Sequence, residues 1–232
     1  MEYALLNAYA QTYEAQVKTR QALMNRMRNW LRDTLPQEQW GDADLSDKQL
    51  ADDKILKLLP NNQMEYFEIV NNFEKSIQKY MQKEVKNHYL WPWLSSVKGI
   101  GENLASKLLF HLKDLNRFPT VSHLWSYCGL DGDDWRKRKH NWALTSICYL
   151  VADSFQYGRK GSGGYRGVYE ERKLYESEKP SCTKCIEMGH LEHCRPAHIN
   201  NKARRYAVKM FLKDLWIENK RIISVPLEEE NK

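Results

Sequence analysis

Apolar residues recur every three or four positions in two long stretches near the start of the chain, residues 3–32 and 63–88. Neither stretch contains glycine or proline. This spacing places the apolar side chains on one face of an α-helix, so both stretches are predicted to be long amphipathic helices. The apolar positions are Leu6, Tyr9, Tyr13, Val17, Leu23, Met27 and Trp30 in the first and Phe67, Val70, Phe73, Ile77 and Tyr80 in the second.

Residues 35–62 connect these two helices and carry helix-breaking residues at both ends. A short helix is predicted inside this segment, since Ser46 and Gln49 have the spacing of a capping box. Two long helices with a return connection predict a helical hairpin or coiled-coil arm over residues 1–92. We expect the arm to join two chains in a homodimer; a plain helical bundle is the alternative.

Helical spacing continues beyond Trp91-Pro92-Trp93, where the proline is predicted to end the preceding helix. Five further helices are predicted, over residues 102–112, 121–127, 142–156, 165–178 and 199–220. The glycines of residues 129–132 and 158–164 predict loops. Since no run of alternating β-branched residues indicates a strand, the predicted fold is all-α. It consists of the arm, a compact helical domain over residues 93–223 and an acidic tail over residues 224–232.

Composition and charge narrow the class of protein. The chain has 232 residues, 42% hydrophobic and 28% charged, with neither a long apolar run nor a secretory leader. This predicts a globular protein with no membrane segment. We expect a cytoplasmic location, either nucleoid-associated in a bacterium or in the host cell for a phage-encoded protein. The net charge of +6 is concentrated in residues 91–223, where 23 basic residues face 14 acidic ones, and this favours a polyanionic partner.

Residues 97–109 read VKGIGENLASKLL and place two glycines directly before a predicted helix. Glycine permits positive φ and leaves the backbone accessible, and the helix start offers unsatisfied N–H groups at the positive end of its dipole. Together they predict an anion site, which we interpret as a helix-hairpin-helix motif that grips the nucleic-acid backbone without sequence specificity. A turn capped by glycine is the alternative. The predicted contacts are Lys98, Gly99, Ile100, Gly101 and Lys107.

Four segments carry a resemblance to a known family: VKGIGENLASKLLFHL, RFPTVSHLWSYCGLD, HNWALTSICYLVADSF and AHINNKARRYAVKMFLKDLW. In this order they resemble the C-terminal domain of the IS110/IS116 insertion-sequence transposases, over residues 93–221. The resemblance implies a role in DNA recombination, DNA as partner, RNA as a second partner, and a coiled coil before the domain. The similarity is greatest to short, stand-alone phage or mobile-element proteins that lack the family's nuclease domain.

The resemblance does not extend to the family's chemistry. The family's N-terminal domain is rich in strands and holds magnesium through four carboxylates, whereas residues 1–92 predict helices only. The family's catalytic serine follows the Gly-Leu turn, and residues 131–142 contain no serine. Thr145 and Ser146 lie in a helical stretch, where a hydroxyl commonly bonds its own backbone. We therefore expect binding of DNA, whether duplex, branched or single-stranded, and assign no catalytic residue.

Two other classes of protein stay open. An active recombinase or metal-dependent nuclease would need paired acids such as Asp133 and Asp134, or Glu170 and Glu171, with Mg²⁺. Adjacent acids on a helix point to different faces, which makes the second pair a poor clamp. A phage-encoded protein–protein adaptor or inhibitor would bind its target with little dependence on salt, whereas nucleic-acid binding weakens steeply as salt rises.

Two further basic stretches are candidate phosphate contacts. One lies between Trp135 and Trp142, where cations beside aromatic rings can neutralise phosphates and stack on unpaired bases. A solvated loop is the alternative. The other is a face of the last helix, which is exposed to solvent by default. The residues are Arg136, Lys137, Arg138 and Lys139 in the loop, and Lys202, Arg205, Lys209 and Lys213 on the helix.

A cysteine and histidine cluster is found in residues 182–194, CTKCIEMGHLEHC. The run resembles a zinc knuckle whose last gap is one residue short. Tetrahedral Zn²⁺ prefers such ligands, and a site filled by four protein ligands is structural rather than catalytic. A loop of reduced cysteines is the alternative. The predicted ligands are Cys182, Cys185, His190 and Cys194, with His193 and His198 as alternative histidines.

Overall fold

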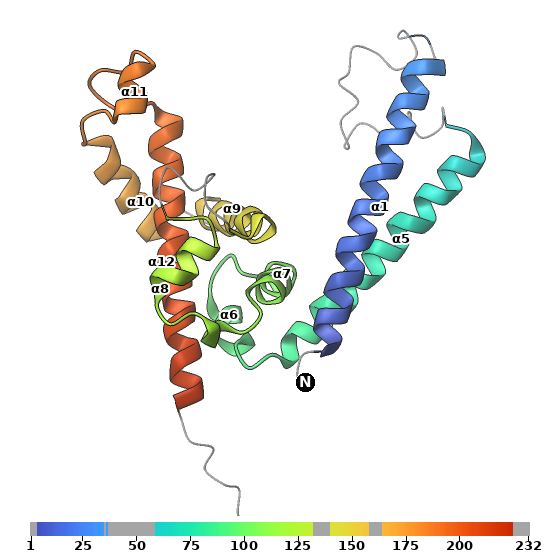
Figure 1. Ribbon diagram of the computed structural model, residues 1–232, viewed down its shortest axis with the longest axis horizontal. Coiled ribbons are helices and arrows are strands. Elements are labelled where there is room, and N and C mark those ends of the chain that lie inside the picture. The colour runs from blue at the N-terminus through green and yellow to red at the C-terminus, as the bar shows by residue number, and fades with distance from the viewer. Residues whose placement is uncertain (1–3, 35, 37–58, 132–139, 158–163, 225–232) are drawn as a thin grey trace, which may run out of the picture. The chain divides into compact units, whose positions relative to one another are not determined.

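The computed structural model describes residues 4–34, 36, 59–131, 140–157 and 164–224 (Figure 1). These residues are helical, apart from turns and one isolated bridge between Pro180 and His193, which confirms the all-α prediction. The chain divides into two units, Met1–Glu84 and Val85–Lys232. Several predicted features lie outside the described residues: the short helix after Ser46, the basic loop Arg136, Lys137, Arg138 and Lys139, the acids Asp133 and Asp134, and the acidic tail beyond Ser224.

The first unit is a helical hairpin of α1 (Ala4–Thr34) and α5 (Asn61–Glu84) (Figure 1). The helices are antiparallel, because Tyr9 near the start of α1 stacks on Tyr80 near the end of α5, with ring centroids 5.4 Å apart. Midway along, Arg20 Nε donates to Glu74 Oε2 at 2.7 Å. The hairpin encloses its own core of Leu23, Met24, Met27, Leu31, Leu59, Phe67 and Val70.

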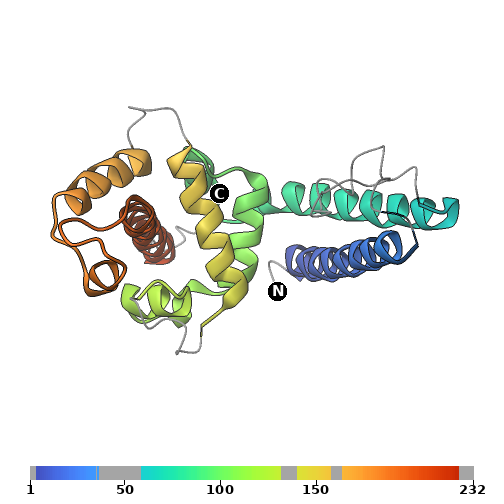
Figure 2. The same ribbon diagram turned by 90° about the horizontal axis from the view of Figure 1, so that it is seen from above.

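The second unit is built around one long helix, α12 (Pro196–Ser224), which Figure 2 shows end-on. Shorter helices surround it, and Phe211 at its centre is fully buried against the rings of Trp93, Phe155 and Tyr165. In chain order the others are α6 (Trp91–Ser96), α7 (Glu102–Leu112), α8 (Val121–Tyr127), α9 (Trp142–Gln156), α10 (Gly164–Ser177) and α11 (Thr183–Glu187), with 3-10 turns at Val85–Asn87 and Leu115–Arg117.

Two prolines of this unit, Pro92 and Pro196, lie at the starts of helices. Pro92 was expected to end the preceding helix instead. The helix expected over residues 63–88 stops at Glu84, and Pro92 lies in the first turn of α6. A first-turn residue has no helical acceptor for its amide, so proline costs nothing there. Pro196 likewise begins α12, which is therefore longer than the predicted 199–220.

His88 gives the second unit an expected dependence of stability on pH. It is buried, its Nδ1 accepts from the amide of Leu90 at 3.2 Å, and burial lowers its pKa to about 4 from 6.5. As the pH falls below 6.5 the unfolded chain takes up this proton first, so His88 should lower the free energy of unfolding by about 3 kcal/mol by pH 4. Denaturant unfolding of wild type and His88→Asn at pH 7 and pH 4 measures this term. An equal pH dependence in both proteins would contradict it.

Candidate nucleic-acid interface and metal centre

A tight turn at residues 97–101 joins α6 to α7. The amide of Ile100 donates to the carbonyl oxygen of Val97 at 3.0 Å, which closes a four-residue turn. Gly99 has φ +95°, as the third position of a type II turn requires. Ile100 is buried in the core and anchors the turn, and Gly101 is the N-cap of α7. Two helices therefore flank the glycine turn, and of these only α7 was predicted from the sequence.

The two glycines of this turn differ in what the fold requires of them. A Cβ at Gly99 would lie 3.0 Å from Oγ and 3.1 Å from the carbonyl oxygen of Ser154 on α9, and its positive φ disfavours other residues. Gly101 has an ordinary φ of −94°, and a Cβ there would meet no atom within 4 Å. The fold therefore requires glycine at position 99. It does not require glycine at position 101, where the missing side chain leaves open space in front of the helix start.

Two main-chain donors of this turn lack a hydrogen-bond partner among the residues that the structure describes. Within the described part of the chain, no hydrogen bond uses the amide of Gly99 or of Gly101. Lys98 is exposed and Lys107 is partly buried on α7. Glu102 in the first turn of α7 forms an ion pair with Lys86, whose Nζ lies 2.6 Å from Oε1. Lys86 was not singled out in the sequence because it precedes the motif. Its positive charge compensates the negative charge of Glu102, which would otherwise repel an anion at the start of α7.

Thr145 and Ser146, whose hydroxyls the sequence analysis considered, lie near the start of α9. Thr145 is buried, and its Oγ1 donates to the carbonyl oxygen of Cys128 at 2.9 Å. Ser146 Oγ donates to the carbonyl oxygen of Trp142 at 3.1 Å. Both hydroxyls thus bond the backbone, as predicted. Trp142, the tryptophan that follows the basic loop in the sequence, is 59% exposed. The centroid of its ring lies 4.3 Å from that of the His140 ring.

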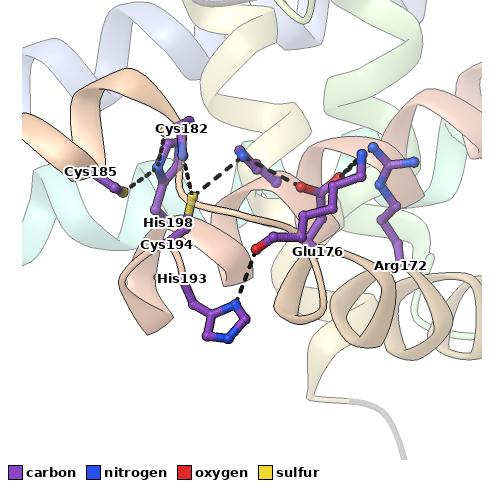
Figure 3. A network of polar contacts seen from close by, with 9 residues as sticks. Arg172, Glu176, Cys182, Cys185, His193, Cys194 and His198 are labelled. Carbon is purple, nitrogen blue, oxygen red and sulfur yellow. Dashed lines mark hydrogen bonds and ion pairs between the residues drawn. The ribbon is translucent and has the colours of Figure 1, made fainter. Parts of the chain in front are cut away.

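Three cysteines converge where α10, α11 and α12 meet (Figure 3). Cys182 is the N-cap of α11, Cys185 lies in its first turn, and Cys194 lies two residues before the start of α12. His198 in the first turn of α12 completes the group, and the four ligand atoms lie within 4.8 Å of one another. Tetrahedral Zn–S and Zn–N bonds of about 2.3 and 2.0 Å would place ligand atoms roughly 3.5–3.8 Å apart. The cluster therefore fits a metal ion after small shifts of its side chains, since the ligand-atom separations lie on both sides of this range.

The histidine of this cluster is His198, and not His190 as the sequence analysis proposed. His190 is exposed, and the turn at Gly189 brings only its amide to the carbonyl oxygen of Cys185, at 2.9 Å. His193 Nδ1 lies 3.2 Å from the carbonyl oxygen of Lys179. His198, in the first turn of α12, has its Nδ1 3.0 Å from Cys185 Sγ and 3.5 Å from Cys182 Sγ.

A polar network surrounds the cluster (Figure 3). The amide of Cys182 donates to Cys194 Sγ at 3.3 Å and lowers the pKa of that thiol, which favours the thiolate that metal binding needs. Lys202 Nζ lies 3.7 Å from the same sulfur and 3.4 Å from Glu176 Oε2. Burial opposes the charge of Lys202, but these two partners outweigh it and raise its pKa. Such outer contacts orient metal ligands and tune their charge.

Comparison with known families supports the class suggested by the turn and its helices. Residues 92–134 match the family model described as Transposase IS116/IS110/IS902 family. The matched segment includes α6, the glycine turn, α7 and α8, and it confirms the resemblance to a transposase C-terminal-type domain. It supports a transposase-related role. No curated protein and no solved structure matches the chain. None of the described helices is long and apolar enough to span a membrane.

Proposed function

We propose that the chain binds DNA through the phosphate backbone at the turn of residues 97–101. The observation that carries this proposal is that, among the described residues, the amides of Gly99 and Gly101 form no hydrogen bond, and that open space lies beside Gly101. A helix start with free N–H groups binds phosphate oxygens through hydrogen bonds and through its dipole. Backbone contacts of this kind read no bases, so the binding is not sequence-specific.

The surrounding charges suit a phosphodiester more than a free carboxylate or a protein surface. Lys98 and Lys107 flank the turn, and Lys86 compensates Glu102. Each additional cation adds a salt-dependent contribution, because phosphate neutralisation releases counterions. The transposase-related match supports DNA as the partner, in duplex, branched or single-stranded form. RNA is the second candidate, because its backbone carries the same phosphodiester groups.

A binding panel tests the proposal. Labelled duplex, fork, junction and single-stranded DNA, and one RNA, are titrated with the full chain at two salt concentrations. We expect binding whose affinity falls steeply with salt, with a slope that reports the number of phosphate contacts. Absence of binding to every probe, or an affinity independent of salt, would overturn the proposal and favour a protein–protein adaptor.

We also propose that Cys182, Cys185, Cys194 and His198 hold a structural Zn²⁺. The ion would tie α11 and its flanking segments to the start of α12, where only Cys185, Cys194 and Ile199 form a small local core. The ligand set supports this, since three thiolates and an imidazole fill a tetrahedral zinc site and leave no position for a substrate.

We further propose that the hairpin of α1 and α5 joins two chains in a homodimer. Besides the face that α5 buries against α1, a second stripe of large apolar side chains on α5 is about half exposed: Tyr66 49%, Ile69 59%, Phe73 49% and Tyr80 55%. Their spacing follows a heptad pattern. Glu65 and Glu68 lie toward one end of α5 and Lys75 and Lys79 toward the other, so two antiparallel copies centred on Phe73 would pair opposite charges.

Phe73→Glu is expected to convert this dimer into a monomer, because it places two carboxylates at the centre of the paired stripes. Light scattering after size exclusion measures the mass. Asn72→Glu on the same helix is the matched control for an added charge, since Asn72 is exposed and lies outside the apolar stripe, and its effect should be smaller. A wild-type chain that is monomeric at all concentrations would refute the dimer.

A further inference from the structure

A basic groove lies between α10 and α12 in the second unit, beyond the end of α8. Its volume is about 360 Å³, and it is open to solvent. The floor includes Leu130 and the ring of Tyr206, and one carboxylate, Glu176, lies in the wall. All the other lining side chains are cations: Arg172 and Lys179 from the side of α10, and Lys202, Arg205 and Lys209 from α12.

The single carboxylate of the groove already has more cations than it can neutralise. Glu176 is 3% exposed, and its oxygens lie 2.5 Å from Arg172, 3.7 Å from Lys179 and 3.4 Å from Lys202. Burial would raise the pKa of Glu176, but these cations outweigh burial and lower it. Glu176 thus compensates three cations, of which Lys202 also contacts Cys194 Sγ, before Arg205 and Lys209 are considered.

Lys209 adds a further positive charge at the end of the groove near α8. Its ammonium lies 4.3 Å from the centre of the Trp125 ring, and no salt bridge to it is found among the described residues. Burial and the neighbouring charge of Arg205 lower the pKa of Lys209, while Asp131 acts in the opposite direction. Cations held this close together repel one another, and an anion in the groove would relieve that repulsion.

We infer that this groove is a second phosphodiester-binding site, separate from the turn at residues 97–101. Lys202, Arg205 and Lys209 lie on one face of α12 over two helical turns, a span of about 10 Å. That span matches about three nucleotides at a rise of roughly 3.4 Å per strand. Arginine and lysine donors on both walls can reach phosphate oxygens, and the Arg172 guanidinium, which lies 4.5 Å over the centre of the Tyr206 ring, is held in place between that ring and Glu176. The inference rests on the proposed nucleic-acid function and adds where a second segment of strand would lie.

The test compares matched charge-neutral variants of α12. Arg205→Gln/Lys209→Gln removes two charges from the groove, and Lys220→Gln/Arg221→Gln removes two from the same helix outside it. Each is titrated with one labelled single-stranded oligonucleotide made as DNA and as RNA. Circular dichroism and thermal unfolding check the fold, and Arg205→Gln alone serves where loss of the Lys209–Trp125 contact disturbs it.

The groove variant is expected to bind about tenfold more weakly than wild type and to show a salt slope smaller by about two, whereas the control changes affinity by less than about twofold. If the groove variant loses more affinity for one of the two oligonucleotides, that difference shows whether the groove binds RNA or DNA. Equal affinities of the groove variant and the control, with binding still sensitive to substitution at Gly101, would overturn the groove and leave the proposed function intact. A wild-type chain that binds neither oligonucleotide would overturn both.

Discussion

Gly101→Asp is expected to weaken DNA binding by at least about tenfold and to leave the fold intact. The new carboxylate would cap α7 and gain a few tenths of a kcal/mol in helix stability. It would also occupy the space in front of the unbonded amides and repel the phosphate. Because no atom lies within 4 Å of a Cβ at this position, the substitution causes no clash. Fluorescence anisotropy with duplex DNA measures the affinity, and thermal unfolding measures the stability.

Gly101→Asn is the matched control for Gly101→Asp, since it has the same shape and capping ability without the charge. Its loss of affinity is expected to be smaller than that of the aspartate, and the difference isolates the electrostatic part. Gly99→Ala is unsuitable for this purpose because its Cβ would approach Ser154. Wild-type affinity in the Gly101→Asp protein would refute phosphate binding at this turn.

Loss of the metal ion is expected to have the second large effect. Structural zinc contributes about 10–16 kcal/mol of binding free energy in small zinc-dependent peptides. Here the main core of the second unit is separate, so we expect local unfolding around α11 and a lower midpoint of thermal unfolding. Addition of a strong chelator, followed by circular dichroism during heating, measures this effect.

Two histidine variants show which ligand set is correct. His198→Ala is expected to reduce the zinc content from about one ion per chain to near zero, as Cys194→Ser should, because three remaining ligands leave the site open. His190→Ala should retain the ion, since that side chain is exposed and lies outside the cluster. Elemental analysis of proteins purified without chelator measures the content. Loss of zinc in His190→Ala and its retention in His198→Ala would instead support the ligand set of the zinc knuckle, with His190. Absence of zinc from the wild-type protein would refute the site.

The longer helices could be predicted from the sequence because their periodicity is strong and their ends are marked. The predicted bounds of α7, α8 and α9 agree with the structure, and Asn141 caps α9 by accepting from the amide of Leu144. The helices α6 and α11 were not predicted. Each is too short to show an apolar period, and α6 has a proline in its first turn, a residue that usually ends a helix.

The candidate sites depended on contacts between residues far apart in the sequence. Spacing alone allowed His190, His193 or His198 as the fourth ligand, and the choice follows from where α12 begins. The different requirements of Gly99 and Gly101 depend on the approach of Ser154 from α9, which no local pattern reveals. The basic face of α12 was visible in the sequence, but its closure into a groove required the packing of α10 beside it.

The contrast between the two glycines also has an evolutionary consequence. Any descendant that keeps this architecture must keep glycine at position 99, whatever its biological role. Position 101 is free to drift once the pressure to hold nucleic acid is gone. If the turn binds nucleic acid as we propose, homologues that keep glycine at position 99 but vary at position 101 are expected to bind it weakly or not at all, and their substitutions would serve as a natural mutagenesis experiment.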